Sequence, residues 1–273
     1  GTSEGDEACV CTQATRGRVL FGYPVKLPMR PNVAAGARHR VSQSAGSPVL
    51  PRLSIVVPIG PGETAWHQLL RDLQGLPVDV ELLLVGVEVA PSDLEMHAAA
   101  LAGRLRWLSA ERGRASQQNA GAAAARAPWL CFLHADSRLD DSALRALASL
   151  PARESALYYF DLGFFDGPAL LRLNALGAKL RSRLFGLPFG DQGLCLPLAE
   201  FERLGQFDAA LPRAEDHALV WAAHRAGLEV RPIGARLLSS GRRYAQAGWL
   251  RTTLRFLWLS LQQARTFARG RHA

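Results

Sequence analysis

Lysine is almost missing from this sequence, and long apolar runs are missing altogether. Lys26 and Lys179 are the only lysines among 32 basic residues, so arginine carries nearly all of the formal charge of +8 and the pI near 10.0. Arginine suits bidentate contacts with phosphate, but a GC-rich genome produces the same bias, so charge alone indicates no specific nucleic acid or other partner. No apolar run approaches the roughly 18 residues of a membrane-spanning helix.

Cysteine is scarce as well, and the first residues lack the basic start and apolar core of a signal peptide. Cys131 and Cys195 lie inside apolar runs that are typical of core thiols, whereas Cys9 and Cys11 form a single CxC in a polar segment. This spacing favours neither a zinc site nor a disulfide framework. With 48% hydrophobic and 21% charged residues, we expect a soluble, globular, cytoplasmic protein.

Composition divides the chain into three segments. Residues 1–50 carry Gly, Ser, Pro and Arg without periodicity, which predicts a disordered or loosely ordered leader. Residues 51–245 alternate apolar strand-like runs with helical patterns and form the predicted domain. Residues 246–273 form a predicted helical extension.

The alternating runs of residues 51–245 predict an α/β fold. Strands are expected at 53–58, 80–87, 104–110, 129–134, 156–165, 190–197 and 228–233, with helices between most of them. The alternation of strands and helices at short intervals indicates a mixed, mostly parallel central sheet flanked by helices. In such sheets, ligands bind beyond the carboxyl ends of the strands.

One strand end carries two chemically versatile side chains. The apolar run Trp129–Leu133 stops at His134-Ala135-Asp136, and in an extended segment His134 and Asp136 point to the same side. A carboxylate with a second polar ligand beside it can hold Mg²⁺ or Mn²⁺ against a diphosphate. The structural alternative is that Asp136 caps the following helix or is a turn residue.

Two helix starts form the next candidates. Arg114 and Asn119 gather near the beginning of one predicted helix, where backbone N–H groups favour anions, although an alanine-rich packing helix explains much of the same pattern. Glu215 and Asp216 open another helix. Acidic residues are favourable in a first helical turn on structural grounds, and either could act as a general base toward an acceptor hydroxyl.

The C-terminal tail is basic and amphipathic. No acidic residue follows Glu229. At about 100° per residue one arc holds Leu250, Leu254, Leu257, Leu261 and Ala268, and the next holds Arg251, Arg255, Arg265 and Arg269. Such a helix can lie on an anionic membrane surface or dock its leucines on the domain, and we favour docking.

These pieces, in this order, resemble the family 2 glycosyltransferases of GT-A fold. The likeness runs from about Leu53 to Arg269 and is closest to the bacterial subgroup found near radical-SAM and arsenosugar-type genes. Five segments carry it: LSIVVP (53–58), GRASQQNAGAAAARAPWLCFLHADSRL (113–139), GDQGLCLPLAEFERLGQFD (190–208), AEDHALVWAAHRAG (214–227) and SSGRRYAQAGWLRTTLRFLW (239–258). Each motif is modest alone, but five in order are specific.

The resemblance implies metal-dependent, inverting transfer of a sugar from a UDP- or GDP-linked donor to an unknown hydroxyl acceptor, with Mn²⁺ or Mg²⁺. Asp136 would be the metal ligand of a DxD-like element, with His134 in the slot that a first Asp often fills. Asp216 would be the base, with Glu215 beside it. The nucleotide-sugar site would include Pro58, Glu63, Arg114, Asn119, Asp191, Gln192, Arg242 and Arg243.

Two positions differ from the family pattern. Relatives usually follow the first strand with an Asn-Glu pair, of which IGPGE keeps only Glu63, and they end the second strand with an aspartate that contacts the base. Here Gly86 and Val87 stand at that end, with Glu88 or Asp93 as candidate replacements. The alternative function is therefore a degenerate fold that serves as a non-catalytic binding or membrane-surface scaffold. A nucleotidyltransferase would need a glycine- and basic-rich loop directly after the first strand. The segment IGPGETAW has the glycines but contains no Lys or Arg, which disfavours this function.

Overall fold

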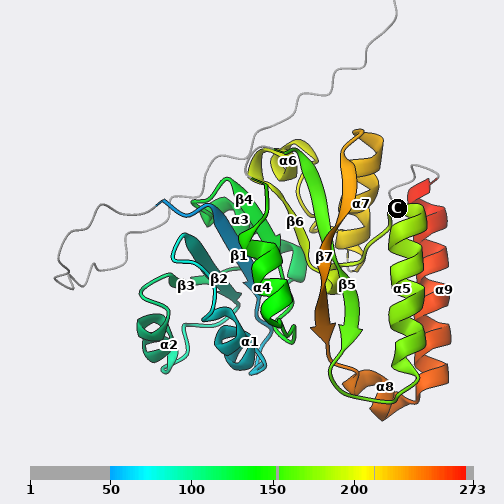
Figure 1. The fold of residues 1–273 in the computed structure, drawn as a ribbon, viewed down its shortest axis with the longest axis horizontal. Helices are drawn as coiled ribbons and strands as arrows, with labels where there is room; N and C mark the ends of the chain where they lie inside the picture. Colours follow the sequence, from blue (N-terminus) through cyan, green and yellow to red (C-terminus); the bar gives the residue numbers. More distant parts are fainter. Residues whose placement is uncertain (1–49, 152–153, 212, 269–273) are drawn as a thin grey trace, which may run out of the picture. The chain divides into compact units, whose positions relative to one another are not determined.

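The computed structural model describes residues 50–151, 154–211 and 213–268, and its centre is one seven-stranded sheet (Figure 1). The strand order is β3-β2-β1-β4-β6-β5-β7. The strands are β1 (Leu53–Pro58), β2 (Val80–Gly86), β3 (Leu105–Ser109), β4 (Trp129–Phe132), β5 (Ala156–Phe164), β6 (Leu194–Pro197) and β7 (Glu229–Ser239).

The sheet is mixed but mostly parallel, as the sequence predicts. β1 pairs in parallel with β2 and β4, β2 with β3, and β5 with β7. The short strand β6 runs antiparallel between β4 and β5. The carboxyl ends of β1, β2 and β4 therefore lie at one edge, the edge at which ligands bind in such sheets.

Helices cover both faces of the sheet, which explains why the strand sequences are continuously apolar. On one face α1 (Trp66–Leu73), α2 (Leu94–Ala100) and α4 (Asp141–Ala148) pack on alternate strand residues such as Ile55 and Val57. On the other face α3 (Arg114–Ala124), α6 (Leu198–Arg203) and α7 (Glu215–Arg225) pack on the intervening residues, including Val56.

Helix α3 packs closely on the sheet at Gly121. A Cβ added at Gly121 would lie 2.3 Å from Cγ1 of Val56, so no larger residue fits there without moving the helix. Near the helix start, the buried amide of Gln117 donates to the carbonyls of Ile59 at 2.8 Å and Val85 at 2.6 Å. These contacts hold the start of α3 against the ends of β1 and β2.

Most predicted elements are confirmed, but some differ, and the short helix at Arg242–Ala247 was not predicted. Helix α2 has no counterpart among the predicted helices. The segment 190–197 begins as a short 3-10 helix, η1 (Gly190–Gln192), before β6, and β7 continues to Ser239, beyond the predicted end at residue 233. The predicted leader, residues 1–50, lies outside the described residues except for Leu50, and Arg269 lies outside them too.

The predicted tail is helical, but its leucines do not dock on the domain. After α8 (Arg242–Ala247), helix α9 (Trp249–Ala268) runs beside α5 (Leu171–Phe185) (Figure 1). Asn174 of α5 bonds to Thr253 and Trp249 of α9 at 3.0 and 2.6 Å. Thr252 and Phe267 are the buried side chains of α9, whereas Leu250, Leu254, Leu257 and Leu261 are 52–59% exposed. The docking prediction was wrong because the opposite face of the helix meets the domain.

Candidate active site

Asp136 follows β4 at the carboxyl edge of the sheet and opens into a pocket of about 230 Å³. The pocket is lined by Ala65, Gln68, Asp136, Arg138, Phe165, Asp166, Ser240 and Arg242. The structure thus brings together two predicted site residues, Asp136 and Arg242, that lie far apart in the sequence. A larger hollow of about 370 Å³ lies between residues 204–209 and α7 and contains none of the predicted site residues.

Asp136 is not a helix cap. The cap of α4 is Asp140, whose Oδ1 accepts from the backbone N–H of Ala143 at 2.9 Å. Among the described residues, no hydrogen bond or salt bridge engages the Asp136 carboxylate. Its neighbour Arg138 is held by Asp72 at 2.7 Å and by backbone bonds to Leu238, which tie this turn to β7. Asp136 is therefore a free carboxylate on a well-anchored turn.

A second group of charged side chains lies beside this turn, where α3, α7 and η1 meet. Arg114 at the start of α3 forms a salt bridge to the buried Glu215 at the start of α7. The next residue, Asp216, accepts a hydrogen bond from the backbone N–H of Gly190. A Cβ at Gly190 would lie 2.8 Å from Asp216 Oδ2, so this close approach needs glycine.

The pKa values of the two aspartates of this group, Asp216 and Asp191, are shifted in opposite directions. Burial opposes ionisation of Asp216, but the charges of His217 and Arg114 and the N–H groups of Gly190 and His217 outweigh it and lower the Asp216 pKa. Burial raises the pKa of Asp191, against the opposing charges of Arg181 and His134. Oδ1 of Asp191 is buried with no hydrogen-bond partner among the described residues.

The pKa of His134 is lowered at the same place. Burial and the charge of Arg114 lower the His134 pKa, although Asp191, Asp136 and Asp216 act in the opposite direction. These influences show that His134 shares one electrostatic environment with the other predicted polar residues. A neutral imidazole has a free nitrogen lone pair, which a metal ligand or a hydrogen-bond acceptor requires.

Arg181 of α5 is a site residue that sequence reasoning missed. Its guanidinium lies over the ring of Phe189, 3.2 Å from the centroid, and donates to the carbonyl of Leu187 at 2.8 Å. Burial lowers its pKa to about 10, and the charges of Asp191 and Asp216 act against that shift. Its position in an amphipathic helix pattern carried no signal of this role, because the contacts are made with a loop after that helix.

Several predicted binding residues use their polar atoms within the protein. Glu63 accepts from the N–H groups of Thr64 and Ala65 at 2.9 and 2.8 Å before α1. Asn119 exchanges two hydrogen bonds with the backbone of Phe207, at 2.8 and 3.1 Å. These side chains hold loops in place at the edge of the site.

Gln192 is the most enclosed of the predicted binding residues. It is fully buried, and its amide bonds to Arg181, Ser182, Phe189 and the carbonyl of Phe160 at 2.8–3.2 Å. It therefore supports η1, which presents the neighbouring Asp191.

The remaining predicted residues lie at strand and helix ends. Pro58 ends β1 and pairs with Val85 of β2. Arg242 and Arg243 begin α8 with exposed side chains, and the backbone N–H of Arg242 donates to the Ser240 hydroxyl at 3.2 Å. The Ser240 hydroxyl in turn donates to Asp166 at 3.0 Å. This bond joins the turn before α8 to Asp166, and both residues line the Asp136 pocket.

The two candidates for the missing second-strand aspartate differ in their contacts. The backbone carbonyl of Glu88 accepts from Trp107 Nε1 at 3.1 Å and Ser109 Oγ at 3.2 Å. Asp93 instead contacts His67 and His97. Hydrogen bonding to His67 lowers the pKa of Asp93. The Asp93 carboxylate therefore already contacts the side chains of two histidines.

The arrangement of the sheet and its flanking helices is that of the GT-A fold, as the sequence predicts. One similar solved structure is a mannosyltransferase, PcManGT from Pyrobaculum calidifontis, in complex with GDP-mannose and Mn²⁺; the TM-score is 0.51 at 15% identity. It covers 72% of this chain but only 59% of that chain.

Two further solved structures show weaker similarity. Glucosyl-3-phosphoglycerate synthase from Mycobacterium tuberculosis, in complex with Mn²⁺, UDP and phosphoglyceric acid, aligns with a TM-score of 0.48 at 15% identity over 72% of this chain and 74% of that one. The catalytic domain of Drosophila β1,4-galactosyltransferase 7 aligns with 0.43 at 13%, over 71% and 72%. No family model matches the sequence, and no curated protein matches it significantly.

Proposed function

We propose that the protein is a metal-dependent glycosyltransferase that moves a sugar from a nucleoside-diphosphate donor to a hydroxyl acceptor, with inversion at the anomeric carbon. The observation that carries this proposal is the free carboxylate of Asp136, which faces a pocket shared with Arg242 at the carboxyl edge of a GT-A sheet. The GDP-mannose and Mn²⁺ of the structurally similar mannosyltransferase support a nucleotide-sugar donor and a divalent cation.

The residues at this edge fit a hard divalent cation. Mg²⁺ and Mn²⁺ are usually held by one or two carboxylates, with water and substrate phosphates as the other ligands. Asp136 offers such a carboxylate in the pocket, and His134, two residues before it, offers an imidazole whose pKa is lowered. When bound, the cation supplies positive charge for the departing diphosphate.

Two further steps use residues of the chain: binding of the diphosphate and removal of the proton from the attacking hydroxyl. The Arg242 guanidinium opens into the same pocket and can pair with diphosphate oxygens. The carboxylate of Asp216, ionised at neutral pH, can accept the proton of the attacking hydroxyl, while Arg114 and Gly190 keep it in place. The acceptor oxygen would then attack the anomeric carbon as the bond to the diphosphate breaks.

Donor binding tests this proposal directly. Calorimetric titration of the full chain with UDP- and GDP-sugars is expected to show binding of at least one nucleotide sugar that depends on Mn²⁺ or Mg²⁺. Titration after chelation should abolish the heat, because the donor diphosphate binds through the cation. The matched control is the same titration with the free sugar, which should give no heat.

Absence of metal-dependent binding to every nucleotide sugar would refute the enzyme proposal and favour the alternative of a non-catalytic scaffold. The loss of an aspartate at the end of β2 is the feature that supports this alternative. The same proposal includes membership of glycosyltransferase family 2 and of its radical-SAM and arsenosugar-associated subgroup. It also includes a hexose as the transferred sugar. A product analysis by NMR distinguishes inversion from retention.

We further propose that α5 and α9 contact an anionic membrane surface. The two helices together expose a set of large apolar side chains, including Leu173, Leu176, Leu180, Leu184, Phe185, Leu250, Leu254, Leu257, Trp258 and Leu261. Exposed arginines accompany them, including Arg183, Arg251 and Arg255. Apolar side chains beside arginines are the pattern of helices that lie in a lipid interface. None of the helices in the described part of the chain is both long and apolar enough to cross a bilayer.

Vesicle flotation checks this surface. The full chain is expected to float with phosphatidylglycerol-containing vesicles and much less with pure phosphatidylcholine. The variant Leu254→Gln/Leu257→Gln should lose most of the flotation, because it removes exposed apolar area without touching the buried Thr252 face. Val89→Gln, at an 85% exposed apolar residue elsewhere, is the matched control. Equal flotation of both variants, or a dimer in sedimentation that dissociates in the double variant, would count against membrane contact.

A further inference from the structure

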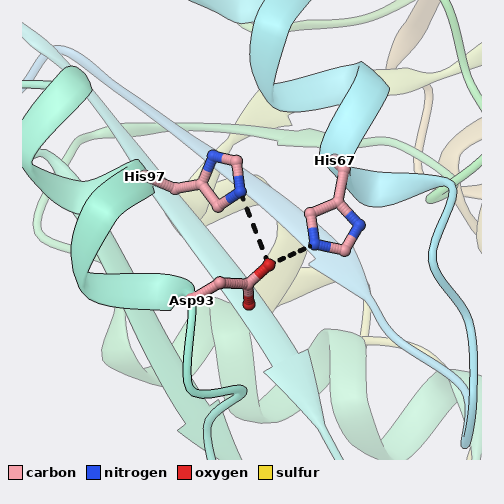
Figure 2. Close-up of side chains that lie close together, drawn as sticks. All are labelled: His67, Asp93 and His97. Carbon is pink, nitrogen blue, oxygen red and sulfur yellow. Dashed lines mark hydrogen bonds and ion pairs between the residues drawn. The ribbon is translucent and has the colours of Figure 1, made fainter.

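Two histidines and an aspartate from α1 and the start of α2 converge (Figure 2), and none of the three lines the Asp136 pocket. His67 comes from α1, Asp93 directly precedes α2, and His97 lies one turn into α2. One nitrogen of each histidine and one oxygen of Asp93 all lie within 4.8 Å of one another. Among the described residues this is the group of three that could hold a metal ion, and it includes neither His134 nor Asp136.

The hydrogen bonds of His67 fix what its ring presents to Asp93. Nδ1 lies 2.8 Å from the carbonyl oxygen of Thr64, which can only accept, so Nδ1 carries a proton. In a neutral imidazole Nε2 is then a lone pair, yet it lies 2.8 Å from Oδ2 of Asp93, which also only accepts. Two acceptors at this distance repel unless a positive charge lies between them, either a second proton on the ring or a shared cation.

The position of His97 favours the shared cation. Its Nε2 lies 3.8 Å from the same Asp93 oxygen, which is too far for a hydrogen bond. Tetrahedral ligands about 2 Å from a zinc ion lie about 3.3 Å from each other, a spacing that the two distances of 2.8 and 3.8 Å bracket. A bond from the other ring nitrogen to a carbonyl, as His67 makes to Thr64, is also the usual support of a metal-binding histidine.

We propose that His67, Asp93 and His97 bind a zinc ion that clamps α1 to the segment leading into α2. Two imidazoles with one carboxylate suit Zn²⁺, whereas Mg²⁺ and Mn²⁺ prefer ligand sets made of oxygen. The side chains are 28%, 41% and 15% exposed in chain order, so solvent can supply the fourth ligand. The site shares no residue with the Asp136 pocket and differs from it in metal preference.

Zinc binding to the chelator-treated full chain tests the proposal. The parent chain for this experiment carries the substitutions Cys9→Ser, Cys11→Ser and Asp136→Ala, which remove other candidate metal ligands. Equilibrium dialysis is expected to show one zinc ion per chain, and Co²⁺ in its place should give the visible absorption of a four-coordinate site. Removing a residue that only hydrogen-bonds to a metal ligand costs about 10–100-fold in metal affinity. His97→Ala and Asp93→Asn should each therefore weaken zinc binding at least about 100-fold.

Two matched controls isolate the three ligands. Glu95→Gln makes the same charge change as Asp93→Asn on the exposed side of α2, and His224→Ala removes an exposed imidazole from α7. Both should bind zinc like the parent chain. His97→Asn provides a second, polar substitution in case the alanine variant folds poorly. Equal zinc binding by the parent and the ligand variants, or no zinc binding by the parent, would overturn the proposal in favour of an imidazolium–carboxylate ion pair. This result is independent of donor binding at Asp136.

Discussion

Asp216→Asn is expected to lower turnover about 10²–10⁴-fold while donor affinity stays within about twofold, because removing a general base affects the chemical step and not donor binding. The amide oxygen of asparagine can still accept the N–H of Gly190, so the start of α7 should keep its place. Single-turnover kinetics with the donor identified by calorimetry, combined with donor titration of the variant, measures the two effects separately.

Two comparison variants make this test specific. Asp141→Asn makes the same substitution in the first turn of α4, on an exposed side chain, and controls for the effect of an acidic residue on the helix dipole. It should leave turnover unchanged. Asp191→Asn reports on the neighbouring carboxylate with the raised pKa. Full turnover by Asp216→Asn, or loss of turnover in Asp191→Asn alone, would show that Asp216 is not the base.

Asp136→Ala should abolish metal-dependent donor binding and, with it, turnover. The Asp136 carboxylate has no hydrogen bond or salt bridge to any described residue, so its removal breaks no such interaction, and the variant should unfold at nearly the parent temperature. Calorimetry with Mn²⁺ and the nucleotide sugar measures the loss, and thermal unfolding without metal checks the fold.

Asp136→Asn refines the same experiment. Asparagine keeps the size of the side chain but removes its charge, so it should bind Mn²⁺ far more weakly than the parent chain. Asp141→Asn again serves as the matched control, with unchanged metal-dependent binding. If Asp136→Ala binds the donor with the parent's metal dependence, the cation is held elsewhere, and the proposed role of the turn after β4 is wrong.

Local pattern was enough to predict most of the elements. The run Leu53–Pro58 is apolar at every position, and this indicates a strand with both faces covered, which the helices on the two sides of β1 confirm. The alanine-rich pattern predicts a packing helix, and the 2.3 Å that a Cβ at Gly121 would leave to Val56 shows how closely α3 packs. These features depend on residues near one another in the chain, so periodicity is sufficient.

Long-range contacts account for what was missed. Asn119 and Gln192 have the residue types of ligand-binding amides, but bonds to Phe207 and to Arg181 and Phe160 use them inside the protein. Their partners lie 11 to 88 residues away, beyond the reach of any local pattern. The metal-binding trio is similar, because Asp93 and His97 meet His67 only through the packing of α2 beside α1.

The sequence by itself determined the α/β class, the mostly parallel sheet and the placement of His134 and Asp136 at a strand end, because hydrophobic periodicity sets which faces are buried. Only the tertiary structure decided which carboxylates are free and which are occupied. Asp136 has no partner among the described residues, Asp93 meets two histidines, and Asp216 meets Gly190. The same holds for the tail, whose amphipathic pattern predicts a helix but does not show which face meets the domain. Free and occupied side chains look alike in a sequence, since their difference lies in neighbours that folding brings from distant parts of the chain.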